Sequence, residues 1–341
     1  MEADLTGPRL KRSQQRSAHA SEAYRRRHAP ERDPRVAVHE AESDDVGVEL
    51  GDERDVSRRA DPGLEALAAL DAEVVVRRSR ARSIAYHRTP MSGLASQYER
   101  QARWRAWAEA ISRVPLQRTH RVLDLGCGVG DVAALFHARG AQVIGVDGDE
   151  ALLSFARARH PGVRFEQTDV RDVVPASFGM VDGIWSSFVA AYLDDLPSVV
   201  SRWRACLAPD GWLALVEVDD LLGHEPLPSP MGARIEEFYS IAARRYDFRC
   251  GRKLVGAAER AGLVVAHDGV LPDAELSFQG SASAEVLEAW RLRFERMGGL
   301  RDFFGADFAA LQRAFLDALS SPEHRARCEV RLVVARCPEP R

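Results

Sequence analysis

The chain has 341 residues, of which 45% are apolar, and a formal net charge of -4. This length supports one large domain or two small ones, and the charge gives no global attraction to nucleic acid or anionic membrane. No apolar run approaches the ~20 residues of a transmembrane helix. The N-terminal stretch MEADLTGPRLKRSQQR lacks the apolar centre of a signal peptide. We therefore expect a soluble, cytoplasmic protein without a membrane partner.

Residues 1–60 are rich in Arg, Glu, Asp, Ser and Pro and nearly free of aromatic residues, which predicts a disordered tail. Residues 61–118 are expected to form N-terminal helices, at 63–82 and again after Thr89-Pro90. In the second stretch Tyr98, Trp104, Trp107 and Ile111 recur at roughly helical spacing, which predicts one amphipathic helix before the first strand.

From residue 119 to 337 the pattern predicts one α/β domain. Strands are expected at 121–125, 142–146, 163–166, 181–186 and 212–218, with helices between them at 130–139, 149–159 and 196–207. This alternation is typical of a doubly wound parallel sheet. Helices at 231–244 and 252–262 then lead to a strand at 263–270, a helical insert at about 280–322 and a last strand at 328–336.

The five cysteines show no CxxC pair and no metal-ligand spacing, which favours reduced thiols: Cys127, Cys206, Cys250, Cys328 and Cys337.

The most informative segment is RVLDLGCGVGD, residues 121–131, in which a hydrophobic strand runs into Gly126, Gly128 and Gly130 and then into a helix. Glycines allow the backbone to approach a ligand closely, and the helix N-terminus offers unpaired N–H groups. Nicotinamide-binding folds use a similar turn, with GxGxxG rather than the GxGxG spacing found here. The loop alone predicts only a nucleotide-like ligand.

Acidic residues close the neighbouring strands. Asp124 precedes the loop, and Asp147 ends the next strand, where its carboxylate can accept hydrogen bonds from two ribose hydroxyls. Asp169 ends the third strand, where it could accept from an adenine amine, although Asp is also common in turns.

The motifs LDLGCGVG, VIGVD, TDV, VDGIWSSFVAAYL and LAPDGWLALVE occur in that order. In content, order and spacing they resemble the class I, seven-stranded methyltransferases that use S-adenosylmethionine (SAM) as methyl donor. The resemblance covers residues 84–337. It implies strand order 3-2-1-4-5-7-6 with an antiparallel seventh strand, and a methyltransferase activity that depends on SAM.

The resemblance also implies a role for each matching residue. The loop residues face the methionine part of SAM, Asp124 lies near its amino group, and Asp147 with Gly148 holds the ribose. Asp169 and Val170 flank the adenine, and Ser187 lies near the methyl group. Tyr98 closes over SAM, unless its ring packs on the sheet instead. The implied SAM positions are Tyr98, Asp124, Gly126, Cys127, Gly128, Gly130, Asp147, Gly148, Asp169, Val170 and Ser187.

Catalysis is less constrained, because SAM carries the reactivity and a base is needed only if the acceptor must lose a proton. His224, after the fifth strand, is the candidate base, and an ordinary surface histidine is the alternative. Tyr246 and Arg249 are candidates for an acceptor pocket, although arginines in a solvated turn are common. No metal is expected, because Ser186-Ser187 occupy the place of the acid that such sites need beside Asp219 and Asp220.

The acceptor is expected to be a small molecule methylated on oxygen or nitrogen. SSFV replaces the Asn/Asp-Pro-Pro-aromatic motif of base-amine methyltransferases, which disfavours nucleic acid. The insert carries many large apolar residues, which could pack it against the domain or form a lid over a small, partly apolar acceptor. A protein, peptide or RNA methyltransferase and a noncatalytic SAM-binding partner remain alternatives, and the oligomeric state is not predicted.

Overall fold

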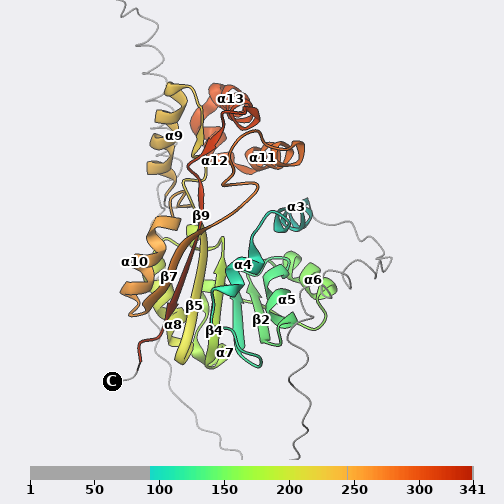
Figure 1. Cartoon of the computed structure of the whole chain (residues 1–341), viewed down its shortest axis with the longest axis vertical. Helices are drawn as coiled ribbons and strands as arrows, with labels where there is room; N and C mark the ends of the chain where they lie inside the picture. The colour runs from blue at the N-terminus through green and yellow to red at the C-terminus, as the bar shows by residue number, and fades with distance from the viewer. Residues whose placement is uncertain (1–92, 244, 340–341) are drawn as a thin grey trace, which may run out of the picture. The chain divides into compact units, whose positions relative to one another are not determined.

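A seven-stranded sheet organises the residues that the computed structural model describes, 93–243 and 245–339 (Figure 1). Its strands are β1 (Arg121–Leu125), β2 (Gln142–Asp147), β3 (Arg164–Gln167), β4 (Val181–Ser187), β5 (Leu207–Asp219), β7 (Val264–Leu271) and β9 (Glu329–Arg336). Their order is β3-β2-β1-β4-β5-β9-β7, and β9 is antiparallel to both neighbours. Counted along the chain, this is the expected order 3-2-1-4-5-7-6, so the predicted fold is confirmed. The expected tail at 1–60 and the helix at 63–82 lie outside the described residues.

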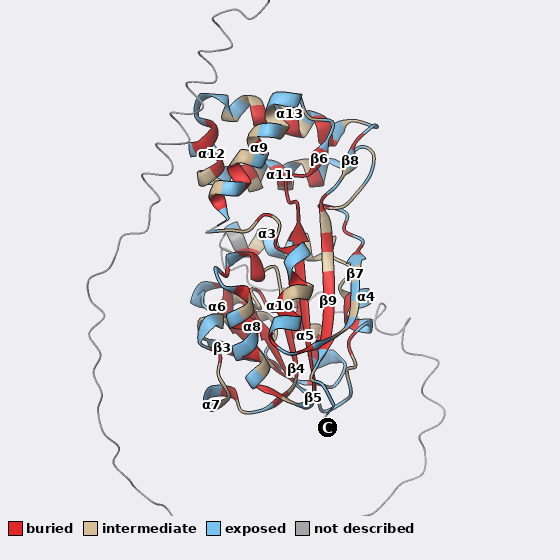
Figure 2. Ribbon diagram, turned by 90° about the vertical axis from the view of Figure 1, so that its left-hand side faces the viewer, coloured by how far each residue is buried: buried red, intermediate tan, exposed pale blue. Residues whose placement is uncertain are grey.

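Helices cover both faces of the sheet because successive strand residues point to opposite sides. Val122 and Trp185 pack in one hydrophobic cluster, while their neighbours Leu123 and Ile184 pack in another. The first cluster includes α4 (Trp107–Ser112), α5 (Asp131–Ala138) and α6 (Glu150–Arg159), and the second α7 (Pro175–Phe178), α8 (Leu196–Ala205) and α10 (Leu254–Arg260). Figure 2 shows the strands between them largely buried.

A helical cap lies beyond one end of the sheet (Figures 1 and 2). We define it as α9 (Ser229–Ala242), α11 (Ala284–Arg296), α12 (Gly298–Phe304) and α13 (Phe308–Ser320), with the short antiparallel pair β6 (His224–Glu225) and β8 (Arg325–Ala326). The predicted insert at 280–322 corresponds to α11–α13. Helix α9 joins them, since the Phe238 and Phe303 rings lie 5.6 Å apart.

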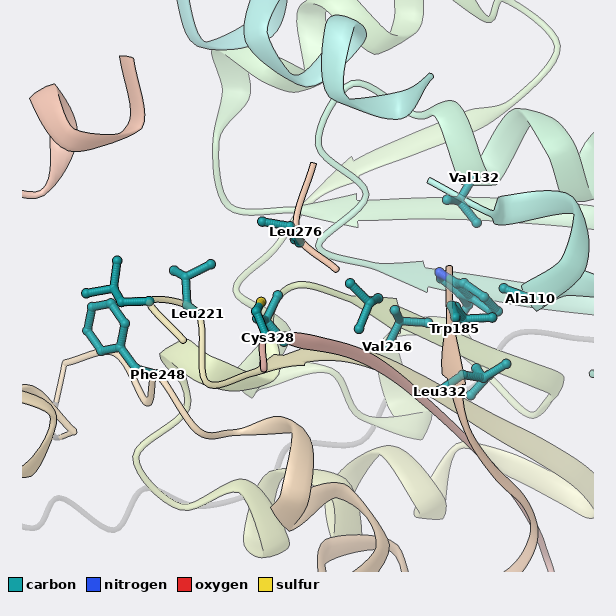
Figure 3. Close-up of a cluster of buried hydrophobic side chains, with 14 of the residues drawn as sticks. Ala110, Val132, Trp185, Val216, Leu221, Phe248, Leu276, Cys328 and Leu332 are labelled. Carbon is teal, nitrogen blue, oxygen red and sulfur yellow. The ribbon is translucent and has the colours of Figure 1, made fainter. Parts of the chain in front are cut away.

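The cap and the sheet share one hydrophobic core. Buried side chains run from Ala110 and Trp185, at the sheet, to Leu221 and Phe248, next to the cap (Figure 3). Short 3-10 turns complete the chain: η1 (Val170–Asp172), η2 (Ala190–Tyr192), η3 (Gly251–Lys253) and η4 (Gly305–Asp307). Within the described residues, none of the helices has the length and hydropathy that crossing a bilayer requires.

The prediction of a single helix before the first strand is wrong. The chain forms α3 (Gly93–Ala102) and α4, separated by a break at residues 103–106. In this break Arg105 pairs with Asp273 and Glu275, at 2.6 and 2.7 Å, and forms a β-bridge to Asp273. These buried tertiary contacts override the local helical pattern.

Candidate active site

The glycine-rich loop connects β1 to α5 and takes a conformation that side chains disfavour. Gly126 has φ 74°, and a Cβ there would lie 2.1 Å from Cγ2 of Val189. Only glycine therefore fits at this position. The N–H groups of Gly126 and Cys127 donate to the carbonyl of Val146 in β2, at 2.7 and 3.0 Å, which fixes the loop against the sheet.

Asp147 holds the other side of this loop. One carboxylate oxygen accepts from the N–H of Gly128 at 2.8 Å, and the other accepts from the N–H of Asp149 at 2.9 Å. Beside it, no atom lies within 4 Å of the Cβ position of Gly148. An oriented carboxylate therefore stands next to open space at the end of β2.

A cavity of about 460 Å³ opens over this loop. Its wall comes from α3, from the ends of β2 and β4, from the turn after β3 and from α11 of the cap. Most of the positions expected to contact SAM line it: Tyr98, Gly126, Cys127, Gly128, Asp147, Gly148, Asp169, Val170 and Ser187. The ring of Tyr98 lies 3.7 Å from the Cβ position of Gly128, so this side chain covers the loop.

Two of the expected positions, Asp124 and Gly130, do not line the cavity. Asp124 is 1% exposed and accepts a hydrogen bond from the backbone N–H of Ala133 in α5. Its Oδ2 has no partner among the described residues. Burial raises the pKa of this carboxyl to about 7. The structure thus places Asp124 beneath the first turn of α5.

Asp169 is on the cavity wall but already has a partner. Its carboxylate pairs with the Arg171 guanidinium at 2.6 Å and accepts from the Arg171 N–H at 2.9 Å. These hydrogen bonds lower the pKa of Asp169. The carboxylate therefore caps η1, and adjacent Val170 contributes apolar surface to the cavity.

The structure does not bring His224 to the cavity, which corrects its expected place beside the acceptor. Its side chain is 1% exposed inside the cap, and its Nδ1 lies 2.9 Å from Nε2 of His324. The rings of Trp290 and Phe315 lie edge-on at 5.1 and 5.2 Å. Burial lowers the pKa of His224 to about 3. An imidazole this deeply buried is a core residue and not a base for a bound acceptor.

Of the two candidates for an acceptor pocket, Tyr246 and Arg249, only Tyr246 lines the cavity. Tyr246 lines the cavity and meets the Tyr192 ring edge-on, with 4.9 Å between centroids. Arg249 does not line it. Its guanidinium pairs with Glu236 at 2.5 Å and lies over the Tyr239 ring. The expected role of Arg249 in an acceptor pocket is therefore not supported.

The cavity wall contains three arginines that the sequence did not single out: Arg105, Arg293 and Arg296. Arg105 bonds to Asp273 and Glu275, and Arg293 bonds to Glu275 at 2.5 Å. The Glu275 side chain is 0% exposed, and these arginines hold its pKa at about 2. Two cations and two carboxylates thus balance within this network.

Arg296, the third arginine of the cavity wall, forms no ion pair with Asp273 or Glu275. Among the residues that the structure describes, no carboxylate lies within ion-pair distance of its guanidinium. Partial burial and the neighbouring positive charge of Arg293 lower the pKa of Arg296. Arg296 is therefore a solvent-exposed arginine of the cavity wall to which the described residues offer no carboxylate partner. Only the position of Arg296 three residues after Arg293, on the insert expected to form a lid, could have indicated it in the sequence.

No histidine lies among the described residues of the cavity wall. Nor do residues 93–243 and 245–339 contain a cluster of three or more His, Cys, Asp or Glu side chains suited to a metal ion. Asp219 forms three hydrogen bonds with Arg252, and Asp220 accepts from the Tyr239 hydroxyl at 3.2 Å.

Residues 123–215 match the model of a methyltransferase domain family. The trans-aconitate 2-methyltransferase of Methylobacterium radiotolerans is 34% identical over 227 residues, which cover 66% of this chain and 80% of that protein. The enzyme of the same name from Methylobacterium nodulans is 39% identical over 131 residues, so the match spans 37% of this chain and only half of that relative. A solved SAM-dependent methyltransferase from Mesorhizobium loti aligns with TM-score 0.41 and 18% identity, covering 67% of this chain and 96% of that one.

A doubly wound sheet with a glycine loop and acids at its carboxyl edge defines a nucleotide-type ligand site. The chain belongs to the class I SAM-dependent methyltransferases. It is an enzyme that transfers the methyl group of SAM.

Proposed function

We propose that the acceptor is a small carboxylic acid, which the enzyme converts to its methyl ester. The observation that carries this proposal is Arg296, a guanidinium on the cavity wall that has no carboxylate partner among the described residues. A carboxylate is the natural partner of such a group, because it can accept two parallel hydrogen bonds from it. The relatives named trans-aconitate 2-methyltransferase add support, since their named substrate is a carboxylic acid.

We propose that SAM lies along the loop side of the cavity. The residues present fit it: the glycines present backbone, and Asp147 stands beside the open space at Gly148, where ribose hydroxyls can donate to it. Asp169 and Val170 would then flank the adenine, with Ser187 near the methyl group. SAM supplies an electrophilic methyl group on a sulfonium. Tyr98 lies over the loop and would exclude water there.

The acceptor side needs alignment and no base. A carboxylic acid with a pKa of about 4 is already ionised at neutral pH. Its oxygen forms the new O–CH₃ bond as the S–CH₃ bond breaks, and no proton moves. This agrees with a cavity wall in which no described residue is a histidine. Arg296 would hold the carboxylate in line.

The experiment is methyl transfer from SAM to a panel of carboxylic acids, including trans-aconitate, with esters detected by mass spectrometry. Arg296→Gln is expected to raise the KM for the acid at least tenfold, because a charge-assisted hydrogen bond is worth about 1.5–3 kcal/mol. The dissociation constant for S-adenosylhomocysteine should stay unchanged. Arg291→Gln is the matched control, since this arginine lies on the outer face of the same helix and pairs with Glu288 and Glu295.

Methylation of amines or alcohols without any ester would contradict the carboxylate proposal. Equal effects of the two arginine substitutions would contradict the role of Arg296.

We further propose that the enzyme acts in the cytoplasm and does not act on nucleic acid. All five cysteines are free, as expected for a reducing compartment. The net charge of -4 does not suit binding to a polyphosphate backbone.

A further inference from the structure

A second cavity of about 270 Å³ adjoins the first. The two share four lining residues: Tyr192, Tyr246, Arg293 and Arg296. The second cavity extends from these residues into the cap, between α9 and the junction of α11 with α12. Because these residues line both cavities, a molecule placed at Arg296 can extend from the first cavity into the second.

The inner wall of this second cavity is apolar. Leu221, Phe238, Phe248 and Leu300 line it and are each at most 7% exposed. Figure 3 shows Leu221 and Phe248 side by side. Desolvating such a wall favours an apolar ligand group over a polar one, at about 25 cal/mol per Å² of apolar surface. Arg245 lies on the outer wall, where it is exposed to solvent.

The charged side chains at the boundary between the two cavities indicate how many carboxylates the acceptor carries. Arg105 and Arg293 pair with Asp273 and Glu275, whereas Arg296, where the cavities meet, has no carboxylate partner among the described residues. Arg296 can pair with one ligand carboxylate at this boundary, while Arg245 lies on the outer, solvent-exposed wall. A second or third carboxylate in the inner cavity would be buried against Leu221, Phe238 and Phe248 without a partner, which is costly.

We propose that the preferred acceptor is a monocarboxylic acid with an apolar chain or ring, rather than a polycarboxylate such as trans-aconitate. Its carboxylate lies at Arg296 and its apolar part fills the second cavity. This inference rests on the proposed carboxylate methylation. The size agrees, because an apolar cavity of about 150 Å³ already holds benzene, and this one measures about 270 Å³.

The test uses the full chain, SAM and straight-chain acids from butanoate to decanoate, together with phenylpropanoate, octanedioate and trans-aconitate. We expect kcat/KM to rise about fourfold per added methylene, the equivalent of ~0.8 kcal/mol per buried CH₂ group, until the cavity is full. The same order should appear in the thermal shift that each acid causes in the presence of S-adenosylhomocysteine, a readout that needs no turnover.

Ala242→Leu fills the second cavity from α9, where Ala242 is 5% exposed and lines the wall. It should remove the gain from chain length and leave the S-adenosylhomocysteine affinity unchanged. Ala243→Leu, at the next and exposed position, is the matched control. If Ala242→Leu does not fold, the chain-length series on the unaltered chain still decides.

Rates independent of chain length, or a preference for octanedioate or trans-aconitate, would overturn this inference and leave the proposed ester formation standing. The absence of ester from every acid would overturn both.

Discussion

At the scale of single residues, Asp147 joins the loop to the ligand site. A carboxylate has about four acceptor positions, and the N–H groups of Gly128 and Asp149 use one on each oxygen. The remaining positions stay available toward the open space at Gly148. The same side chain can therefore set the loop conformation and contact a ligand.

Asp147→Ala should weaken S-adenosylhomocysteine binding about 10- to 100-fold, because hydrogen bonds to a charged group are worth about 1.5–3 kcal/mol. Isothermal titration calorimetry measures this. Asp172→Ala, at an exposed acid near the cavity, should have no effect. Unchanged affinity in Asp147→Ala would contradict both the ribose contact and the role of Asp147 in holding the loop.

His224 makes the stability of the protein depend on pH. Burial lowers its folded pKa from 6.5 to about 3, so the folded state holds the neutral imidazole. The contribution of His224 to stability is therefore complete above pH 6.5 and is lost as the pH falls toward 3, because the unfolded chain binds the proton more readily. At pH 5 the loss from His224 amounts to about 2 kcal/mol.

His224→Phe should reduce the difference in unfolding free energy between pH 8 and pH 5 by about that amount, as measured by urea denaturation. At pH 8 the variant should be less stable than the parent, since His324 loses its partner. His137→Gln, on the exposed face of α5, should leave the pH dependence as it is. An unaltered pH dependence in His224→Phe would refute a neutral buried imidazole.

The sequence indicated some site residues and not others, for a physical reason. Asp147, Asp169 and Ser187 end parallel strands, and strand ends meet at one edge of the sheet, so sequence position implied spatial position. Arg293 and Arg296 reach the cavity only because the cap folds back over it. In RLRFERM nothing distinguishes the inward Arg293 from the outward Arg291. His224 was misplaced because the loop after β5 enters the cap instead of ending at the cavity.

At the scale of elements, the buried charges around Glu275 connect three segments. Glu275 accepts from Gln101 in α3, Arg105 in the break before α4, and Arg293 in α11. Each partner lies on or next to the cavity wall. The network therefore ties the N-terminal helices to the cap and orients the arginine beside Arg296.

Glu275→Ala should destabilise the fold by about 3–5 kcal/mol, because removing one partner leaves buried charges uncompensated. Chemical denaturation measures the loss. Glu288→Ala removes an ion pair from the exposed face of α11 and should cost far less. Comparable losses in the two variants would show that the network does not hold the elements together.

Helices and strands with a regular hydrophobic pattern could be predicted from the sequence. Elements whose bounds or packing depend on contacts between residues distant in sequence could not. The sheet order followed from alternating strands and helices, since parallel strands need crossovers. The break between α3 and α4 was not predictable in this way, because it depends on the ion pair of Arg105 with Asp273, which lies 168 residues later in the chain. The pairing of α9 with α12 likewise depends on contacts such as Phe238 with Phe303, which no local pattern encodes.

At the scale of the whole described unit, the cavity joins regions that are far apart in sequence. Tyr98 and Gln101 come from α3, the loop residues from the ends of the first strands, and Arg293 and Arg296 from α11. A ligand that fills the cavity thus contacts the sheet, the N-terminal helices and the cap together. Binding energy should consequently stabilise all three, although only the loop carries the family motif.

S-adenosylhomocysteine at 100 times its dissociation constant should raise the unfolding free energy by about 2.7 kcal/mol. Hydrogen exchange should slow in the loop at 126–131 and also in α3, whose Tyr98 ring covers the loop. Addition of a carboxylic acid should then extend protection to α11 through Arg296. Protection confined to the loop, with α3 and α11 unaffected by either ligand, would mean that the cavity is not filled as one site. Protection of α11 by the acid in the parent chain and not in Arg296→Gln would tie this coupling to the guanidinium itself.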